Sequence, residues 1–346
     1  MPETRTPART PRRSGRVSIV DVAAAAGVSR QTVSNVLNGR KEYYSEDTHS
    51  RVIAAMDSLG YQPNRAAQSL RSQRSMQIGW HIFGEQLQAM RGFTLQFLQA
   101  LVKATSDVDH HLVVFTHHDD DALQVFKDLV ARRTVDAVIL SESGVDDERA
   151  RFLAEHGLPF ASFGRLAPDL PQHWVDIDNA AGMHPLVDHL VSAGHRQFAY
   201  IGAEGGEFWK AERLEGFRTA LAEHGLRVPA NAVLHGDDAA VRAHTRRLLA
   251  RRNRPTAIVA GNDAIAAVVV NVVHSVGLRA GRDVAVTGFD GGAIGLFTEP
   301  TLTSVRIPVE RIARELVDRC LRQVRDGAVD GPGLLVPTEI VRGGSA

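Results

Sequence analysis

Residues 18–38 read SIVDVAAAAGVSRQTVSNVLN, and in this stretch small and apolar residues recur at the spacing of two short helices. Ser18 followed by Asp21 is typical of a capped helix start, and Gly27 stands where a tight turn requires a positive φ angle. Ser29 is placed to cap a second helix. The pattern predicts a helix-turn-helix unit, which in DNA-binding proteins lays its second helix in the major groove. The alternative is an ordinary helical hairpin within a larger core.

The second predicted helix carries polar side chains on what we expect to be its early outward face. In the major groove Arg pairs with guanine, whereas Gln and Asn pair with adenine. The candidates for reading bases are therefore Arg30, Gln31, Ser34 and Asn35. Ser29, Thr32 and Asn38 are better suited to phosphate contacts, which fix position and carry no sequence information. For each of these side chains the alternative is a solvated helix face.

Two further segments complete the first part of the chain. Residues 45–59 predict a third helix, with Val52, Ile53, Met56 and Leu59 as its apolar stripe. Pro63 interrupts the helical pattern, and residues 64–70 have helical composition with little apolar surface. Such a segment is a candidate for folding on binding, with a plain linker as the alternative.

From residue 76 onward, short apolar runs alternate with longer amphipathic segments. The runs lie near residues 78, 111, 136, 158, 198, 256 and 283. This alternation predicts parallel strands covered by helices. Seven strands over so long a segment fit two doubly wound lobes better than one sheet, with a switch between lobes near residues 174–179.

The distribution of charge also divides the chain in two. The 346 residues include 40 Lys and Arg and 40 Asp and Glu, so the formal net charge is zero. Residues 1–74, however, contain 12 basic and 6 acidic side chains, whereas residues 75–346 contain 28 and 34. The first part is expected to attract phosphate and the second is not. The apolar content of 44% excludes a disordered chain.

Several classes of protein are disfavoured by what the sequence lacks. Residues 1–16 lack the apolar core of a signal peptide, and their composition indicates a disordered basic tail. The longest apolar run, 264–270, is too short to span a membrane. We expect a cytoplasmic protein, nucleoid-associated when it is bound to DNA. The glycines lack the dinucleotide-binding and Walker spacings, and there is no GxSxG sequence, so no enzyme is expected.

Metal binding is also disfavoured. Cys320 is the only cysteine, which excludes a cysteine-based zinc site. The histidines form two pairs, His110 with His111 and His117 with His118, followed by residues Asp119, Asp120 and Asp121. The pairs flank a predicted strand and so lie at its opposite ends, where one ligand set is awkward. We expect the aspartates to cap the next helix.

The chain resembles the lactose/galactose repressor (LacI/GalR) family of bacterial transcription factors from about residue 17 to residue 343. The resemblance is carried by DVAAAAGVSRQTVSNVLNG at 21–39 and LGYQPNRAAQSLRS at 59–72, and in the body by AERLEGF at 211–217, AGNDAIA at 260–266 and TGFDGG at 287–292. It implies an all-α helix-turn-helix head (17–62), a hinge helix and linker (63–75), and an effector-binding and dimerisation body (76–346) similar to periplasmic binding proteins. Lobe one would comprise about 76–176 and 306–333, and lobe two about 177–305 and 334–346.

The resemblance also assigns site residues. The hinge helix would enter the minor groove through Asn64, Ala67 and Leu70, with Leu70 as an apolar wedge that kinks DNA. Arg213, Asn262 and Asp290 match family positions that contact the effector. Further candidates for the pocket are Phe93, Arg165, Trp174, Phe208 and Trp209. The usual family loop after the first strand is replaced by GEQLQAMRGFT at 84–94, so the first-lobe ligand contacts do not transfer to this chain.

By this resemblance the protein is a homodimeric repressor of carbohydrate-utilisation genes, released from a palindromic double-stranded operator by a small sugar-like effector. No cofactor is implied. One alternative is a regulator that needs a co-repressor and responds to a ligand other than a sugar. Others are a sugar-binding or sugar-modifying protein on the same fold.

Overall fold

The computed structural model describes residues 17–37, 39–61, 74–83, 92–116, 123–144, 146–205, 208–327 and 331–346. The contacts divide the chain into two compact units, Met1–Arg74 and Ser75–Ala346, which we call the head and the body. Among the described residues no helix is both long and apolar enough to cross a membrane. The tail, Asn38, the hinge candidates Asn64, Ala67 and Leu70, most of loop 84–92 and the histidines at 117 and 118 lie outside these ranges.

The described part of the head contains three α-helices. They are α1 (Ile19–Ala26), α2 (Arg30–Leu37) and α3 (Glu46–Leu59), with the short 3-10 helix η1 (Lys41–Tyr43) before α3. The Ser18 amide donates to Asp21 Oδ2 at 2.8 Å, and the Asp21 amide donates back to Ser18 Oγ at 3.4 Å. Gly27 ends α1 with φ 65°, and Ser29 Oγ accepts from the Thr32 amide at 3.0 Å. The predicted helix-turn-helix is confirmed.

The three helices enclose a small apolar core. Its buried members are Val22, Ala23, Ala26, Val33, Val36, Val52 and Ala55. Ile53 is 37% exposed, so its predicted place in the inner stripe of α3 is wrong. Successive helical residues are rotated by about 100°, and Val52 already points inward, which turns Ile53 away and brings Ala55 to the core.

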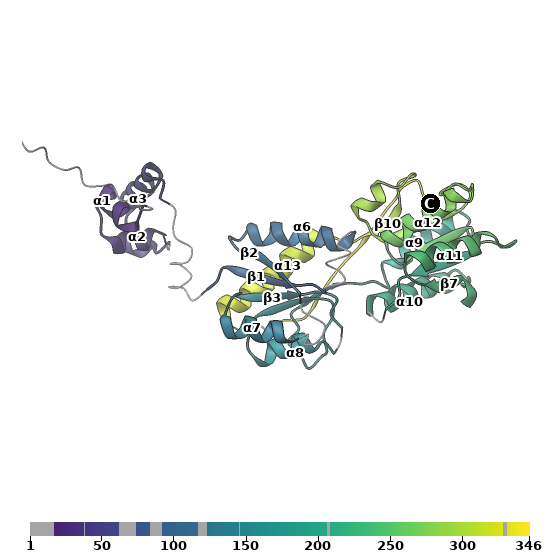
Figure 1. The fold of residues 1–346 in the computed structure, drawn as a ribbon, viewed down its shortest axis with the longest axis horizontal. Helices are drawn as coiled ribbons and strands as arrows, with labels where there is room; N and C mark the ends of the chain where they lie inside the picture. The colour runs from purple at the N-terminus through teal and green to yellow at the C-terminus, as the bar shows by residue number, and fades with distance from the viewer. Residues whose placement is uncertain are drawn as a thin grey trace, which may run out of the picture. The chain divides into compact units, whose positions relative to one another are not determined.

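Lobe one of the body is organised around a sheet of six parallel strands. They are β1 (Gln77–His81), β2 (His111–Phe115), β3 (Ala137–Leu140), β4 (Phe160–Phe163), β5 (Trp174–Ile177) and β11 (Leu334–Val336), in the order β11-β5-β4-β3-β1-β2. Helices α6 (Phe93–Ser106) and α13 (Val309–Asp326) cover one face, and α7 (Gln124–Arg132) and α8 (Glu148–Glu155) cover the other (Figure 1). Cover on both faces explains why strands such as AVIL are apolar throughout.

Lobe two repeats this arrangement. Its strands are β6 (Phe198–Gly202), β7 (Val233–His235), β8 (Ala257–Ala260), β9 (Ala285–Asp290), β10 (Thr303–Arg306) and β12 (Glu339–Val341), in the order β12-β10-β9-β8-β6-β7. Only β12 runs antiparallel to its neighbour. Helices α9 (Met183–Ser192) and α10 (Phe208–Glu223) pack on one face, and α11 (Asp238–Leu249) and α12 (Asp263–Ser275) on the other. The short helices η2 (Ala230–Ala232) and η3 (Ala293–Leu296) complete the described lobe.

All seven predicted strands are present, as β1, β2, β3, β4, β6, β8 and β9. Strand β12 is the C-terminal strand that the resemblance implied for lobe two. Strands β5, β7, β10 and β11 were not predicted, because none of them stands out as an apolar run in the sequence. One lobe boundary is corrected. Leu334–Val336 were assigned to lobe two, but they form β11 and pair with β5 in lobe one.

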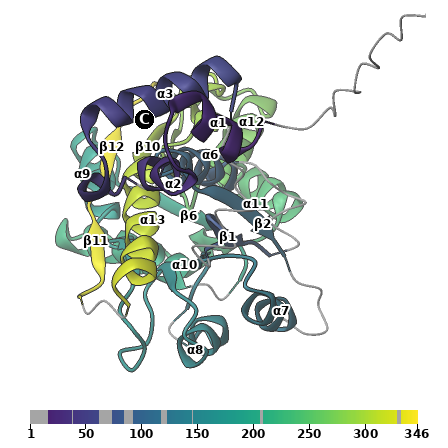
Figure 2. The same ribbon diagram turned by 90° about the vertical axis from the view of Figure 1, so that its left-hand side faces the viewer.

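The chain passes between the two lobes three times. The crossings are residues 178–182 between β5 and α9, residues 307–308 between β10 and α13, and residues 337–338 between β11 and β12. Figure 2 shows the last of these, where β11 and β12 follow one another at the yellow end of the chain. Because the carboxyl ends of β5 and β10 lead directly into crossings, residues at these strand ends lie between the lobes.

Candidate functional site

A pocket lies between the lobes, at the carboxyl ends of the parallel strands. This is the edge at which doubly wound sheets bind ligands. The cavity has a volume of about 190 Å³. The pocket is lined by Trp80, Gly92, Phe93, Thr94, Phe97, Ser141, Glu142, Ser143, Phe163, Gly164, Arg165, Asp176, Ile177, Asn179, Phe208, Trp209, Glu212, Arg213, Asn262, Ala264, Asp290 and Ile307.

Arg213 is the central cation of the lobe-two wall. It projects from α10, is only 5% exposed, and donates from Nε to Asn179 Oδ1 at 2.9 Å. Its Nη1 donates to the Gly261 carbonyl at 2.8 Å and lies 3.4 Å from Asp290 Oδ1. The guanidinium carbon is also 4.4 Å from the centre of the Trp209 ring. Arg213 therefore joins α10, the end of β8 and the end of β9 in one polar cluster.

Gly216 makes this approach possible. A Cβ atom at this position of α10 would lie 2.4 Å from the Ala180 carbonyl oxygen and 2.5 Å from Ala180 Cα. No side chain fits at such distances, so glycine is required where α10 crosses the first interlobe segment. The neighbouring Asn179 is thereby held within hydrogen-bonding distance of Arg213. This gives a physical reason for Arg and Gly at this spacing in the AERLEGF motif.

Asp290 terminates β9 in an unusual state. Its φ angle is 123°, a region that side chains other than glycine rarely adopt. Burial raises its pKa to about 8, against the opposing effect of Arg213, and the nearby Asp263 raises it further. At neutral pH this carboxyl is therefore mainly protonated and is able to donate a hydrogen bond as well as accept one.

Asn262 and Asp263 have structural duties at the start of α12. Asn262 Oδ1 accepts from the Ile265 amide at 2.9 Å and caps the helix, while the residue also lines the pocket. Asp263 is buried, and its carboxylate accepts from Ser304 Oγ at 2.5 Å and from the Gly292 amide at 2.7 Å. Asp263 thus fixes the loop that follows Asp290.

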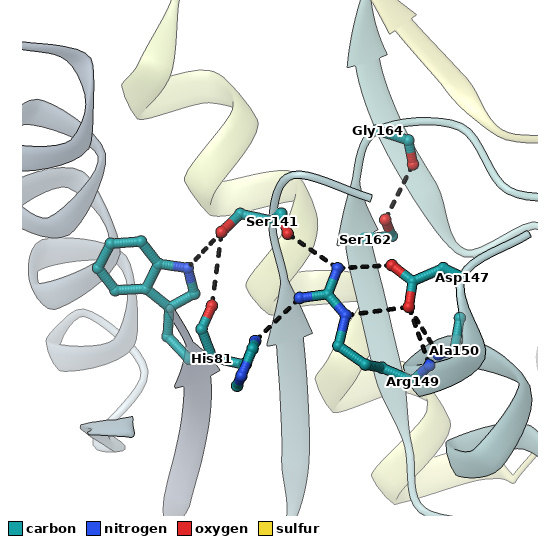
Figure 3. Close-up of polar contacts among 8 residues, drawn as sticks. His81, Ser141, Asp147, Arg149, Ala150, Ser162 and Gly164 are labelled. Carbon is teal, nitrogen blue, oxygen red and sulfur yellow. Dashed lines mark hydrogen bonds and ion pairs between the residues drawn. The ribbon is translucent and has the colours of Figure 1, made fainter. Parts of the chain in front are cut away.

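The lobe-one wall rests on a buried network that joins the ends of β1 and β3 to the start of α8 (Figure 3). Arg149, near the start of α8, donates to both Asp147 oxygens at 2.9 and 2.5 Å. It also contacts His81 Nδ1 at 2.9 Å and donates to the Ser141 carbonyl at 3.1 Å. Because a guanidinium is only a donor, His81 Nδ1 must be the acceptor in this contact. Trp80 Nε1 donates to Ser141 Oγ at 3.1 Å, which places one indole edge and one hydroxyl at the pocket.

Two polar contacts join the lobes across the pocket. Arg165, after β4 in lobe one, donates to Glu212 Oε1 of α10 at 2.7 Å. Trp209 Nε1, also on α10, donates at 3.0 Å to Oε2 of Glu142, which follows β3. Arg165 Nε also lies 3.3 Å from Asp176 Oδ2. Burial raises the pKa of Asp176 to about 6, although Arg165 acts in the opposite direction.

Aromatic side chains provide flat apolar surface on both sides of the pocket. In lobe one, Phe93 stacks on Phe97 and on Phe163, with ring centres 5.7 and 5.6 Å apart. In lobe two, Trp209 lies over Arg213, and Phe208 is 46% exposed. A polyhydroxylated ring combines an apolar face with a hydrogen-bonding edge, and these walls and polar groups match both parts.

Most of the predicted pocket residues are brought together. Those that line it are Phe93, Arg165, Phe208, Trp209, Arg213, Asn262 and Asp290. The assignment of Trp174 is corrected, since this residue does not line the pocket. Trp174 opens β5 and so lies at the amino end of the strand, where its indole donates to Gln172 Oε1 at 2.7 Å.

Sequence reasoning missed several polar lining residues, of which Glu142, Asp176, Asn179 and Glu212 make the contacts described above. Glu142 follows the predicted strand β3, so its place at a strand end was a usable signal. Asp176 and Asn179 lie at the end of β5, a four-residue strand that was not recognised. Glu212 is adjacent to Arg213, but only the fold shows that it faces Arg165.

The head presents a second candidate site on α2. Arg30 and Gln31 are exposed at its start, as predicted for residues on the outward face. Ser34 and Asn35 are only 7% and 8% exposed, so their predicted place on that face is wrong. Their neighbours Val33 and Val36 pack into the core and carry them inward. Asn35 Oδ1 instead accepts from Gln31 Nε2 at 3.2 Å.

The described residues contain no group of three or more His, Cys, Asp or Glu side chains arranged to hold a metal ion. Many polar groups of the pocket bond to one another or to backbone atoms, whereas Ser143 Oγ and Arg165 Nε are buried without a hydrogen-bond partner among the described residues. The pocket thus presents hydrogen-bonding groups, aromatic rings and charged side chains.

Two family models match separate parts of the chain, one in the head and one in the body. Residues 18–64 match the family described as bacterial regulatory proteins, lacI family, and residues 187–346 match the periplasmic binding protein-like domain. The chain is 31% identical over 338 residues to the HTH-type transcriptional regulator CelR of Thermobifida fusca, which covers 95% of this chain and 98% of the relative. It is 28% identical to the regulator GalR of Escherichia coli, over 88% of each chain.

Solved structures are similar over almost the whole chain. A complex of the transcriptional regulator CelR with cellobiose has a TM-score of 0.70 and 29% identity, and covers 96% of this chain and 100% of that one. The lac repressor dimer bound to operator and the anti-inducer ONPF has a TM-score of 0.74 and 26% identity, and covers 96% and 99%. The chain therefore belongs to the LacI family of DNA-binding transcriptional regulators, whose members are not enzymes.

Proposed function

We propose that this regulator is a repressor of carbohydrate-utilisation genes, and that a saccharide bound in the interlobe pocket releases it from a palindromic operator. The observation that carries the proposal is the composition of the pocket. Aromatic rings face a buried arginine, an amide and a carboxyl group at the strand ends of two lobes. A relative, CelR, has been solved with cellobiose, which supports a saccharide as the effector class.

The exposed start of α2 supports the assignment of DNA contacts in the head. Arg30 and Gln31 are our candidates for reading bases, and Ser29 and Thr32 at the N-terminus of the helix are our candidates for phosphate contacts. Asn35, which holds the Gln31 amide, is assigned the role of orienting it. The phosphate contact of Asn38 and the minor-groove contacts of Asn64, Ala67 and Leu70 rest on the resemblance alone.

A homodimer is proposed because one recognition helix reads only a short half-site, whereas two related by symmetry read a palindrome. The lac repressor was solved as a dimer on its operator. In this chain, Leu296 and Phe297 at the end of η3 are 71% and 88% exposed. Such large apolar side chains are usually buried against another surface, and we propose that a second copy of the chain buries them in the dimer interface.

The effector acts by shifting a population. A ligand that contacts both walls binds better to one arrangement of the lobes than to another, and the favoured arrangement determines how the heads are presented to DNA. Linkage requires the reverse effect as well, so operator DNA weakens effector binding by the same factor. The interlobe contacts of Arg165 and Trp209 are where a ligand changes this balance.

Selection of bound DNA from a random pool, with and without a panel of sugars, tests the proposal. We expect a palindromic sequence to be enriched, and one sugar to reduce its recovery. Enrichment that requires the sugar indicates a co-repressor mechanism instead. If every sugar leaves operator affinity unchanged, the effector proposal is wrong, whereas the absence of any enriched sequence contradicts specific operator binding.

A further inference from the structure

We propose that the pocket accepts only saccharides that carry no carboxylate, phosphate or sulfate group. This inference rests on the proposed sugar effector and narrows it, because it excludes sugar acids and sugar phosphates. The reason is that acidic groups are in excess among the described side chains that line the pocket, and the described cationic side chains are already paired with them.

Among the described residues, the lining contains four acidic side chains and two cationic ones. The acids are Glu142, Asp176, Glu212 and Asp290, and the cations are Arg165 and Arg213. With every carboxyl ionised, these side chains carry a net charge of −2. With Asp290 protonated, three carboxylates still face two guanidinium groups. An anionic ligand therefore enters a field of its own sign, in a site with little water to screen it.

Arg165 is already paired with two acidic side chains. Its Nη1 donates to Glu212 at 2.7 Å. Its Nε lies 3.3 Å from Asp176 Oδ2 without making a hydrogen bond among the described residues. Its Nη2 donates to the Ile177 carbonyl at 3.5 Å. Tight binding of a carboxylate or phosphate by arginine uses two parallel N–H groups, and an anionic ligand would compete for them with Glu212 and Asp176.

Arg213 is engaged at two of its three nitrogens and is covered on its faces. Its Nε donates to Asn179, and its Nη1 donates to the Gly261 carbonyl and to Asp290 Oδ1. The guanidinium carbon lies 4.4 Å from the Trp209 ring centre and 3.7 Å from that of Phe289. A bidentate anion needs Nη2 together with Nε or Nη1, both of which already have partners, whereas a hydroxyl group needs only a single donor.

The N-terminus of helix α6 favours an anion in the pocket, but its effective positive charge is smaller than the net negative charge of the lining side chains. Helix α6 begins at Gly92 without a side-chain cap, and Gly92 to Thr94 line the pocket. A helix N-terminus acts as about half a positive charge. That is less than the excess of acidic side chains, so the pocket still disfavours anions, and the free amides suit neutral hydroxyl oxygens.

Equilibrium dialysis of the full-length protein against a mixture of saccharides tests this inference. The mixture contains glucose, galactose and cellobiose with glucuronate, galacturonate and glucose 6-phosphate, and mass spectrometry measures what is retained. We expect a neutral saccharide to be enriched and to bind at least about tenfold more tightly than its own acid or phosphate, a difference of roughly 1.4 kcal/mol. Stronger retention of an anionic sugar overturns the inference but leaves the sugar effector intact. Retention of no saccharide overturns the sugar effector, and the inference with it.

A charge variant separates electrostatics from shape. Glu212→Gln removes one carboxylate and releases one edge of Arg165. We expect its preference for the neutral sugar over the corresponding acid to fall severalfold. Glu215→Gln, on the exposed side of the same helix, is the matched control and is expected to keep the wild-type ratio. If Glu212→Gln leaves the ratio of the two affinities unchanged, the acidic lining does not set the selectivity.

Discussion

At the scale of single residues, some side chains of the two sites could be predicted from the sequence and others could not. Arg213 and Asp290 were found because they lie in short motifs at the ends of recognisable strands. The contact between Gln31 and Asn35 was not foreseen, since burial of Asn35 depends on how α2 packs. The network around Arg149 was also missed, because His81 lies 68 residues away in the sequence and Ser141 takes part through its backbone carbonyl.

Gln31→Ala tests base reading by the head. The exposed amide of Gln31 is suited to one base pair, so we expect the preference at that position to relax, at a cost of about 1 to 3 kcal/mol in operator binding. Binding to a set of single-base operator variants measures this. Equal loss on all operators would instead make Gln31 a phosphate contact. Asn35→Ala is expected to reproduce part of the effect, because it leaves the Gln31 amide without its partner.

Asp290→Asn tests the state of the buried carboxyl. Burial raises its folded-state pKa from an ordinary 3.8 to about 8, so the folded protein holds this proton more tightly than the unfolded chain does. The resulting stabilisation is complete below about pH 4 and is lost as the pH rises through about 8. We therefore expect the unfolding free energy of the wild type, measured relative to Asp290→Asn, to fall over this interval. A difference that stays constant between pH 5 and 8 would mean that Asp290 remains ionised.

At the scale of elements, the long helices could be predicted from their repeating period, and seven strands could be predicted from short apolar runs that alternate with helices. Strands β5, β7, β10 and β11 could not, since tertiary pairing rather than an apolar run makes them strands. The wrong placement of Leu334–Val336 has this origin, because only the register with β5 shows which sheet they join. Asp176 and Asn179 were missed for the same reason, because strand β5 was not recognised in the sequence.

Gly216→Ala tests the close crossing of α10 over Ala180. Replacing glycine by alanine within a helix usually stabilises by about 1 kcal/mol. Here the new methyl group would meet backbone atoms at 2.4 and 2.5 Å, which cannot yield as a side chain would. We expect a net loss of about 1 to 3 kcal/mol in urea denaturation, and weaker effector binding because Asn179 is displaced from Arg213. Glu215→Ala, one residue earlier and exposed, is expected to change neither quantity appreciably.

At the scale of the whole molecule, the division into head and body was visible as a change in the sign of the charge. The two-lobed architecture followed from the number of strands and from the resemblance. Association between copies leaves no comparable mark in the sequence, because an exposed apolar pair such as Leu296 and Phe297 looks like core until the fold places it outside.

Phe297→Asp tests the surface proposed for the dimer. Placing a charge on this 88% exposed ring is expected to shift the protein toward monomer in sedimentation velocity, while the unfolding transition of the body keeps its cooperativity. Affinity for a palindromic operator is expected to fall more than affinity for a half-site. Val276→Asp, at another exposed apolar residue, is the control. A dimer that persists in Phe297→Asp would move the interface elsewhere on the body.

The three chain crossings between the lobes have a mechanical consequence. A single connection would allow one lobe to rotate freely relative to the other. Three short parallel connections allow the lobes to open and close by bending, but they resist twisting of one lobe against the other. Two of them contain a proline, Pro308 and Pro337, whose ring fixes φ and stiffens the connection. Ile307 and Asn179, on two of the crossings, also line the pocket. A ligand in this pocket would therefore contact the connecting segments themselves, so we expect its binding to change the angle between the lobes through these segments.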